Sequence, residues 1–552
     1  MSNALEQASL IMVPSGYEDG TLGSLKPTDG TGDFTFTRGS NISATRVNAD
    51  GYIEKGYENL LLQSNQFDTT WVKVSSTVTS GQAGYDNSND AWLLEKSGAY
   101  GRLDQTAPFS GVQTFSVYAK LTNPTEANCL TLRVDIPNNI VQTNFNLETQ
   151  VVDNNNGFGS IIEQVGDDGW YRCSTTYIGN SIVARIYVAL NGQTNLTTGS
   201  LLIQDAMLNQ GMVAYPYVET TTAPVAGGIL EDMPRLDYSN GSCPSLLLEP
   251  SRTNLLPYTE YYNGWTQTGT TLTTNTTETL SPEGLYNASK LVGNGTSGVI
   301  KSGIAKTGSV AVSVYLKSVS GSVNVTFKDP YGGLSNQVKS VTTEWQRFDF
   351  IGDNGASFAG FWVDDIPTSG IYMWGAQLEQ DATYPTSYIP TYGVSQTRLV
   401  DDLTSTPLSI DGLFGETSGT IFMEFTNPLQ GLVNNWFSMT GSAAGGPAYM
   451  RVRGYWQMNM PGLTWSPTPN LGSLNNATKV SVKWGGGVAK LFIDGQEDAA
   501  STYTGGDINM NFTLSGINGS FNFAKNNANF KQILFFQDSL SDEACIELTT
   551  IS

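Results

Sequence analysis

The stretch Phe115-Ser116-Val117-Tyr118-Ala119-Lys120 alternates apolar and polar side chains, and the pattern returns at Val312-Ser313-Val314-Tyr315-Leu316-Lys317. Alternation with a period of two directs one set of side chains into a core and the other toward solvent. This is typical of an antiparallel sheet with one wet face. The recurrence of the strand indicates a repeated β domain.

Landmarks on both sides of this strand recur in the same order. They are, first copy then second, Asn59-Leu-Leu61 and Asn254-Leu-Leu256, Trp170-Tyr-Arg172 and Trp345-Gln-Arg347, and Tyr215-Pro216 and Tyr384-Pro385. We therefore expect two β-sandwiches of similar topology, over residues 59–224 and 254–400.

The rest of the chain divides into three parts. Residues 1–58 are expected to form an extended N-terminal arm, and residues 225–253, punctuated by Gly, Pro and Asn, an extended connector. From about residue 401 to 552 the pattern changes to strands separated by Gly, Asn and Pro clusters, with Asp494-Gly495 as a hairpin turn. This region predicts a third sandwich.

Composition agrees with an all-β class. A chain of 552 residues is too long for a single hydrophobic core. Its 59 glycines and its many Thr, Ser, Val, Asn and Tyr residues are typical of short strands and tight turns. Helical periodicity is confined to short stretches near residues 3–11 and 541–549. We predict tandem antiparallel β-sandwiches of jelly-roll type, preceded by the arm.

Charge limits the partners. Lys plus Arg number 28 against 50 Asp plus Glu, and a formal charge of −22 disfavours nucleic acid. We interpret the excess of acidic residues as keeping a large assembly soluble, and the alternative is that they form oxygen-rich calcium sites between loops. No other cofactor is expected. No apolar run is long enough to cross a membrane, and no signal segment opens the chain, so neither membrane insertion nor ordinary secretion is expected.

The sequence contains no histidine, which excludes Ser-His-Asp and Cys-His catalysis. The absence of histidine does not exclude a glycoside hydrolase, because that reaction needs only two carboxylates. However, the strand Ile421-Phe-Met-Glu-Phe425 carries a single acid, and Glu497-Asp498 follow a probable turn as solvated charges. We predict that the chain is not an enzyme, with a polysaccharide depolymerase as the weakest alternative.

Aromatic side chains beside Asn and Arg indicate glycan contact, because sugar C–H faces stack on rings while hydroxyl groups need fixed donors and acceptors. The alternative is that these aromatics belong to sandwich cores. The candidate glycan-binding residues are Trp436, Tyr455, Trp456 and Trp465 in the third unit, and Tyr262 and Trp265 in the second copy. The third unit is preferred, since it is the terminal domain.

Several segments resemble known proteins. Trp374-Gly-Ala-Gln-Leu-Glu379, followed by Tyr384-Pro-Thr-Ser-Tyr-Ile-Pro-Thr391, resembles the closing segment of carbohydrate-binding-module-like sandwiches. The segments 26–38, 234–238 and 248–255 resemble head or tail fibre proteins of phages that infect Bacteroidetes. The last 150 or so residues are similar to concanavalin A-like, laminin-G-type jelly rolls in their strand pattern and in the hairpin Leu491-Phe-Ile-Asp-Gly495.

The resemblance implies a bacteriophage virion protein, made in the host cytoplasm and built into a head or tail fibre or appendage. It further implies contact with other virion proteins through the N-terminal arm, host surface glycans as potential ligands, and a homo-oligomer, with a trimer favoured. A purely structural capsid or tail decoration protein is the alternative.

Overall fold

The structure is a computed structural model that describes residues 2–551, apart from 19, 40–42, 154, 240, 406–411, 416–417, 426–436, 444–445, 453–455, 461–462, 466–477, 503–520 and 524–527. Antiparallel strands dominate it, and the prediction of an all-β chain of tandem sandwiches is confirmed. The helical segments described are α1 (Ser2–Gln7), the 3-10 turn η1 (Pro14–Gly16) and α2 (Asp542–Thr549). Among the described residues, no helix combines the length and apolar character that a bilayer crossing requires.

The first sandwich buries a core between two sheets, with Trp71, Phe115 and Ile186 among its members. Strands of the first sheet, in spatial order, are β16 (Phe158–Val165), β17 (Trp170–Ile178), β12 (Val112–Leu121), β19 (Ser200–Gln210), β10 (Ala91–Lys96) and β9 (Ser76–Gln82). Those of the second are β15 (Val151–Asp153), β14 (Asn139–Asn146), β13 (Cys129–Ile136), β18 (Val183–Ala189), β11 (Arg102–Thr106) and β8 (Val72–Val74).

The second sandwich repeats this plan around a core that includes Leu291, Val314 and Phe361. One sheet contains β25 (Thr271–Thr273), β26 (Ser289–Val292), β33 (Ile371–Gln380), β23 (Arg252–Asn254) and β34 (Gln396–Arg398), with β28 (Val310–Ser318) joining β33 to β31 (Gln346–Gly352). The other contains β24 (Thr266–Thr268), β27 (Ser297–Ala305), β32 (Phe358–Ile366), β29 (Val323–Lys328) and β30 (Gln337–Val341).

The repeat extends to local geometry. In each sandwich the alternating strand has a register shift against its partner, between Ser116 and Tyr118 on β12 and between Ser313 and Tyr315 on β28. The asparagines that open the copies also correspond. Oδ1 of Asn59 accepts from the backbone N–H of Leu61 and Leu208, and Oδ1 of Asn254 accepts from those of Leu256 and Leu378.

The third sandwich is completed by segments from the first half of the chain. One sheet runs β21 (Arg235–Asp237), β22 (Ser245–Leu248), β45 (Ala528–Phe536), β36 (Gly419–Phe425), β41 (Lys479–Gly485), β42 (Val488–Ile493) and β43 (Gln496–Thr502), with β1 (Leu10–Met12) also on β45. The other runs β2 (Tyr17–Glu18), β3 (Thr21–Leu22), β4 (Phe34–Thr37), β35 (Asp402–Ser405), β44 (Phe521–Phe523), β37 (Phe437–Ala443), β38 (Gly446–Val452), β39 (Trp456–Met460) and β40 (Leu463–Trp465).

This pairing corrects two expected boundaries. The N-terminal segment is not a separate arm, because Leu10 pairs with Phe535 and Leu403 with Phe36. The connector 225–253 is likewise not free-standing, since Leu247 of β22 pairs with Asn529. Edge strands expose unpaired N–H and C=O groups, and the sheets of the third sandwich satisfy theirs with these segments.

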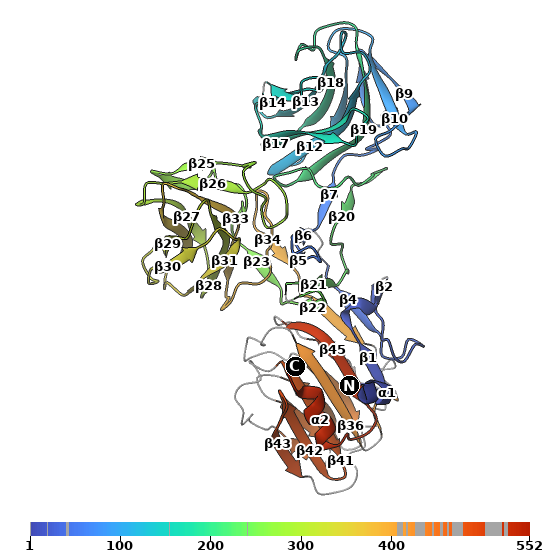
Figure 1. Ribbon diagram of the computed structural model, residues 1–552, viewed down its shortest axis with the longest axis vertical. Helices are drawn as coiled ribbons and strands as arrows, with labels where there is room; N and C mark the ends of the chain where they lie inside the picture. Colours follow the sequence, from blue (N-terminus) through green and yellow to red (C-terminus); the bar gives the residue numbers. More distant parts are fainter. Residues whose placement is uncertain are drawn as a thin grey trace.

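The lobes meet at a central junction (Figure 1). Around it lie the ribbon of β5 (Thr45–Val47) and β6 (Ile53–Lys55), together with β21, β22, β23 and β34, while β7 (Tyr57–Asn59) and β20 (Val225–Gly227) lead to the first sandwich. Both chain termini lie in the C-terminal lobe. The chain therefore passes through the junction each time it moves between lobes.

Candidate functional site

Five ionised side chains gather at the junction and form what we call the arginine cluster: Arg38, Arg235, Glu249, Arg398 and Asp401. Each stands at or next to the end of a strand that reaches the junction, namely β4, β21, β22, β34 and β35 in that order. Their side chains are only 0–2% exposed. Buried charges are tolerated when they are paired and hydrogen-bonded, so their partners decide what the cluster does.

Asp401 joins two of the arginines. Its Oδ1 lies 3.2 Å from Nη1 of Arg38, and its Oδ2 accepts from Nη2 of Arg235. The backbone N–H of Glu249 donates to the same Oδ2 at 2.9 Å. Asp401 thus links the N-terminal segment, β21 and the segment after β22.

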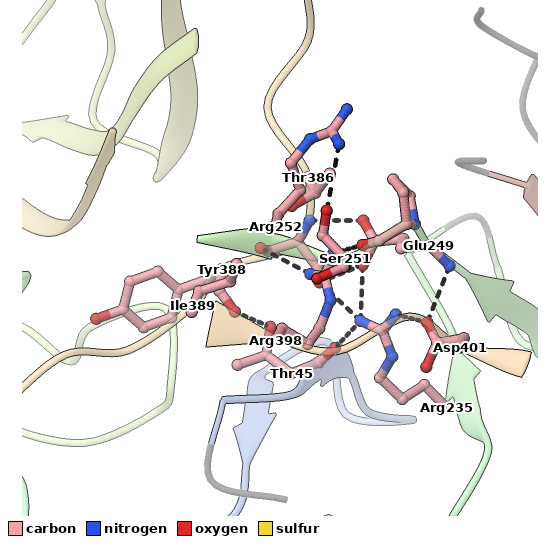
Figure 2. Close-up of polar contacts among 12 residues, drawn as sticks. Thr45, Arg235, Glu249, Ser251, Arg252, Thr386, Tyr388, Ile389, Arg398 and Asp401 are labelled. Atoms are coloured by element: carbon pink, nitrogen blue, oxygen red, sulfur yellow. Dashed lines mark hydrogen bonds and ion pairs between the residues drawn. The ribbon is translucent and has the colours of Figure 1, made fainter. Parts of the chain in front are cut away.

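Glu249 joins the other side of the cluster (Figure 2). Its Oε2 lies 2.8 Å from Nη1 of Arg235 and 2.9 Å from Nη1 of Arg398. Ser387, in the segment between β33 and β34, donates to Glu249 from its backbone N–H at 2.7 Å and from its hydroxyl at 2.5 Å. Arg235 also donates to the carbonyl oxygen of Thr45 at 3.0 Å, which adds the β5 ribbon to the network.

The network shifts the pKa values of Glu249 and Arg235 toward their charged forms. Burial alone would raise the pKa of Glu249, but the charges of Arg398 and Arg235 and the bonds from Ser387 lower it to about 2. Burial opposes the charge of Arg235 as well, yet Asp401 and Glu249 raise its pKa above the ordinary value. For Arg38 burial prevails and lowers the pKa to about 10, which still leaves it protonated at neutral pH.

A second buried group, the lysine cluster, consists of Lys55, Glu260, Glu283 and Asn287. Nζ of Lys55, at the end of β6, lies 2.7 Å from Oε1 of Glu260 and 3.0 Å from Oε1 of Glu283. Four aromatic rings surround the ammonium group, with centroids 5.3 to 5.9 Å away: Tyr215, Trp374, Tyr388 and Tyr392. Such rings attract a cation through their negative faces.

Neither cluster resembles a site that is open to substrate, since its charged groups are buried and face one another. Within the described residues, no set of three or more Asp, Glu or Cys side chains is spaced to hold a metal ion. The described residues therefore offer no candidate for the calcium sites that were the alternative explanation of the acidic residues.

The structure contradicts one pair of predicted glycan residues. Tyr262 and Trp265 lie in the core of the second sandwich, at 0% and 5% exposure, with their rings edge to face and 5.2 Å apart. The hydroxyl of Tyr262 donates to the carbonyl oxygen of Thr259. The prediction that these two bind a glycan is wrong, because their rings are used for packing.

The predicted residues of the third sandwich are only partly described. Trp456 begins β39 and Trp465 ends β40, and these strands pair with Met458 opposite Trp465. Trp436 and Tyr455 lie outside the described residues. The prediction for all four stays a prediction.

Sequence reasoning did not single out the arginine cluster. Arg38 and Asp401 are separated by 363 positions, and isolated charges carry no pattern that reveals such a pairing. A signal did exist: the segments 26–38, 234–238 and 248–255, which carry the fibre-protein resemblance, contain Arg38, Arg235 and Glu249.

No protein-family model and no curated protein matches this sequence. Among solved structures, the chain is similar to the sialidase module "Ruminococcus gnavus IT-sialidase CBM40 bound to alpha2,3 sialyllactose", with 15% identity, a TM-score of 0.21, and coverage of 26% of this chain and 89% of that one.

It is also similar to the CBM22 tandem of Paenibacillus barcinonensis Xyn10C (12% identity, TM-score 0.21, covering 62% of this chain and 99% of that one). The tandem CBM51 modules of Streptococcus pneumoniae Sp3GH98 show 10% identity and a TM-score of 0.18, over 64% of this chain and 98% of theirs. At these TM-scores none of the likenesses assigns a ligand or a function to this chain.

Proposed function

We propose that the chain is a structural protein of a bacteriophage particle, a subunit of a head or tail fibre or appendage, that holds its sandwiches in a fixed arrangement and presents them to host glycans. The observation that carries the structural role is the arginine cluster, in which buried charges from five strand ends pair with one another. In this role the protein does not cleave the glycans that it contacts.

The cluster supports a scaffold because each sandwich already has its own apolar core. Desolvation makes a buried ion network a weak source of stability, whereas its strict geometry can specify one arrangement over others. Since the cluster joins segments that belong to different lobes, the property it specifies is the orientation of those lobes.

The resemblance to phage fibre proteins supports the virion assignment. The segments that resemble fibre proteins contain Arg38, Arg235 and Glu249. These three residues belong to the arginine cluster, which we propose fixes the orientation of the lobes. The proposed oligomer is a homotrimer, attached to other virion proteins through the N-terminal segment.

Both termini lie in one lobe (Figure 1), so projection of the C-terminal sandwich no longer follows from its place in the chain. Immunogold labelling of purified particles, with one antibody to the first sandwich and another to the C-terminal lobe, tests the proposal. Label on projecting appendages supports it, and a particle without label refutes the virion role. Label spread evenly over the shell would favour a purely structural decoration protein.

A glycan array probed with the full-length protein tests the ligand class. Release of reducing ends from host capsule during the same incubation would show an enzyme and contradict the proposal. Light scattering of the purified protein tests the trimer.

A further inference from the structure

In the lysine cluster, an amine and a carboxamide share the same two carboxylates. Nζ of Lys55 contacts Oε1 of Glu260 and Oε1 of Glu283, while Nδ2 of Asn287 donates to Oε2 of Glu260 at 3.1 Å and to Oε2 of Glu283. The two oxygens of one carboxylate are adjacent, so groups bound to opposite oxygens of the same carboxylate lie next to each other. Two such bridges hold Lys55 beside Asn287.

The surroundings exclude water. The side chain of Lys55 is 1% exposed, as is that of Glu260, and Asn287 is fully buried. Oδ1 of Asn287 has no hydrogen-bond partner, so the amide is not held by a second donor. A buried amine that is held beside an amide and screened from water is an arrangement that favours reaction between them.

We propose that Lys55 and Asn287 form an intramolecular isopeptide bond, with Glu260 and Glu283 as the catalytic carboxyl groups. The lone pair of Nζ attacks Cγ of Asn287, the Nζ–Cγ bond forms, the Cγ–Nδ2 bond breaks, and one ammonia molecule leaves. Amine plus carboxamide gives amide plus ammonia, so the step requires no oxidant, reductant or external cofactor.

Two carboxylates provide the proton transfers. Burial acts to lower the pKa of Lys55, but Glu260 and Glu283 outweigh it and raise that pKa, so the ammonium form rests in the site. Glu260 can accept one proton across the 2.7 Å contact and free the nucleophile. Burial, assisted by the charge of Glu260, raises the pKa of Glu283 to about 7, so this carboxyl group is available to protonate the leaving nitrogen.

The bond would close a covalent loop around the whole first sandwich. Lys55 ends β6 of the N-terminal segment, and Asn287 lies just before β26 of the second sandwich. A cross-link of this kind restrains the unfolded chain and fixes one lobe to another. It would make the junction resistant to denaturants and to mechanical load.

Intact mass spectrometry of the purified full-length protein under denaturing, reducing conditions tests the proposal. We expect a mass lower than that of the sequence by one ammonia molecule, about 17 Da, and a protease digest in which the Lys55 and Asn287 peptides are joined. A mass equal to that of the sequence overturns the proposal, whatever the variants do.

Variants identify the origin of the mass loss, because a succinimide at an Asn-Gly pair loses the same mass without joining peptides. Lys55→Met and Asn287→Ala should each restore the full sequence mass, and Glu260→Gln should block or slow the loss. Lys306→Met, which removes a buried lysine elsewhere in the second sandwich, should keep it. A deficit that persists in Lys55→Met overturns the proposal.

Discussion

At the scale of single residues, the arginine cluster differs from the surface ion pairs of the chain in its burial. Lys120 and Asp168, for example, pair at 2.6 Å with 26% and 82% exposure. Water screens such a surface pair, and its loss costs little. Removing one carboxylate of the buried cluster instead leaves buried cations without one of their counter-ions.

Asp401→Asn should lower the free energy of unfolding by about 3–5 kcal/mol, the range for breaking a buried ion pair on one side. The physical reason is that Arg38 and Arg235 both lose their shared carboxylate. Urea denaturation of the full-length protein measures the change. Asp168→Asn is the matched control and should shift the free energy of unfolding by less than about 1 kcal/mol; equal effects of the two variants would contradict the prediction.

The lowered pKa of Glu249 predicts that the free energy of unfolding decreases in acid. Its pKa falls from 4.5 to about 2 on folding, so the folded state binds this proton more weakly than the unfolded state. Its stabilisation is complete above about pH 5 and is lost as the pH falls toward 2, amounting to about 3 kcal/mol. Urea denaturation between pH 2 and 6 should show this slope in the wild-type protein, and Glu249→Gln should flatten it. Parallel curves would refute the assignment.

Sequence reasoning at this scale was least accurate where orientation decides the outcome. Tyr262 and Trp265 flank Asn263 in a turn-like stretch, a composition that fits a sugar site and a buried packing pair equally well. Only the fold shows that both rings point into the core. Similarly, the partners of Arg398 lie in segments that no local pattern connects to it.

At the scale of elements, short strands from the first half of the chain complete the C-terminal sandwich. β1 and β22 lie end to end along β45, which pairs with β36 on its other side. Leu10 of β1 and Leu246 of β22 belong to the same core as Trp484. The C-terminal sandwich therefore depends on residues more than 200 positions away in the sequence.

Leu10→Ala should destabilise this lobe by about 2–5 kcal/mol, because the side chain is fully buried and its removal leaves a cavity. Leu5→Ala is the control, since Leu5 in α1 is 39% exposed. Hydrogen exchange measured on peptides from β45 should accelerate in Leu10→Ala and stay unchanged in Leu5→Ala. Unchanged exchange in both would show that β1 does not support the sheet.

The sequence predicted long elements better than short ones. The alternation at residues 115–120 and 312–317 identifies β12 and β28, strands of ten and nine residues. The expected solvent-facing side is not found, because most residues on both faces of these two strands are buried. β1 and β21 have three residues each, too few for periodicity, and their partners are remote. The sequence therefore did not predict that the N-terminal segment pairs with the C-terminal sandwich.

At the scale of the whole molecule, glycan contact and lobe orientation are separate properties. On a glycan array, Trp456→Ala and Trp465→Ala should each reduce binding of the full-length protein at least tenfold, if these rings stack on sugar. Tyr100→Ala is the control, because Tyr100 is 54% exposed on the first sandwich. Full binding by both tryptophan variants would move the site away from the C-terminal sandwich.

The fixed arrangement of the lobes is tested most directly by small-angle X-ray scattering of the full-length protein. We expect the wild-type profile to fit the single arrangement of Figure 1. Arg235→Met, prepared in a Lys55→Met background so that the lysine cluster cannot hold the junction, should give a larger radius of gyration. A wild-type profile that fits only a mixture of lobe orientations would contradict the scaffold.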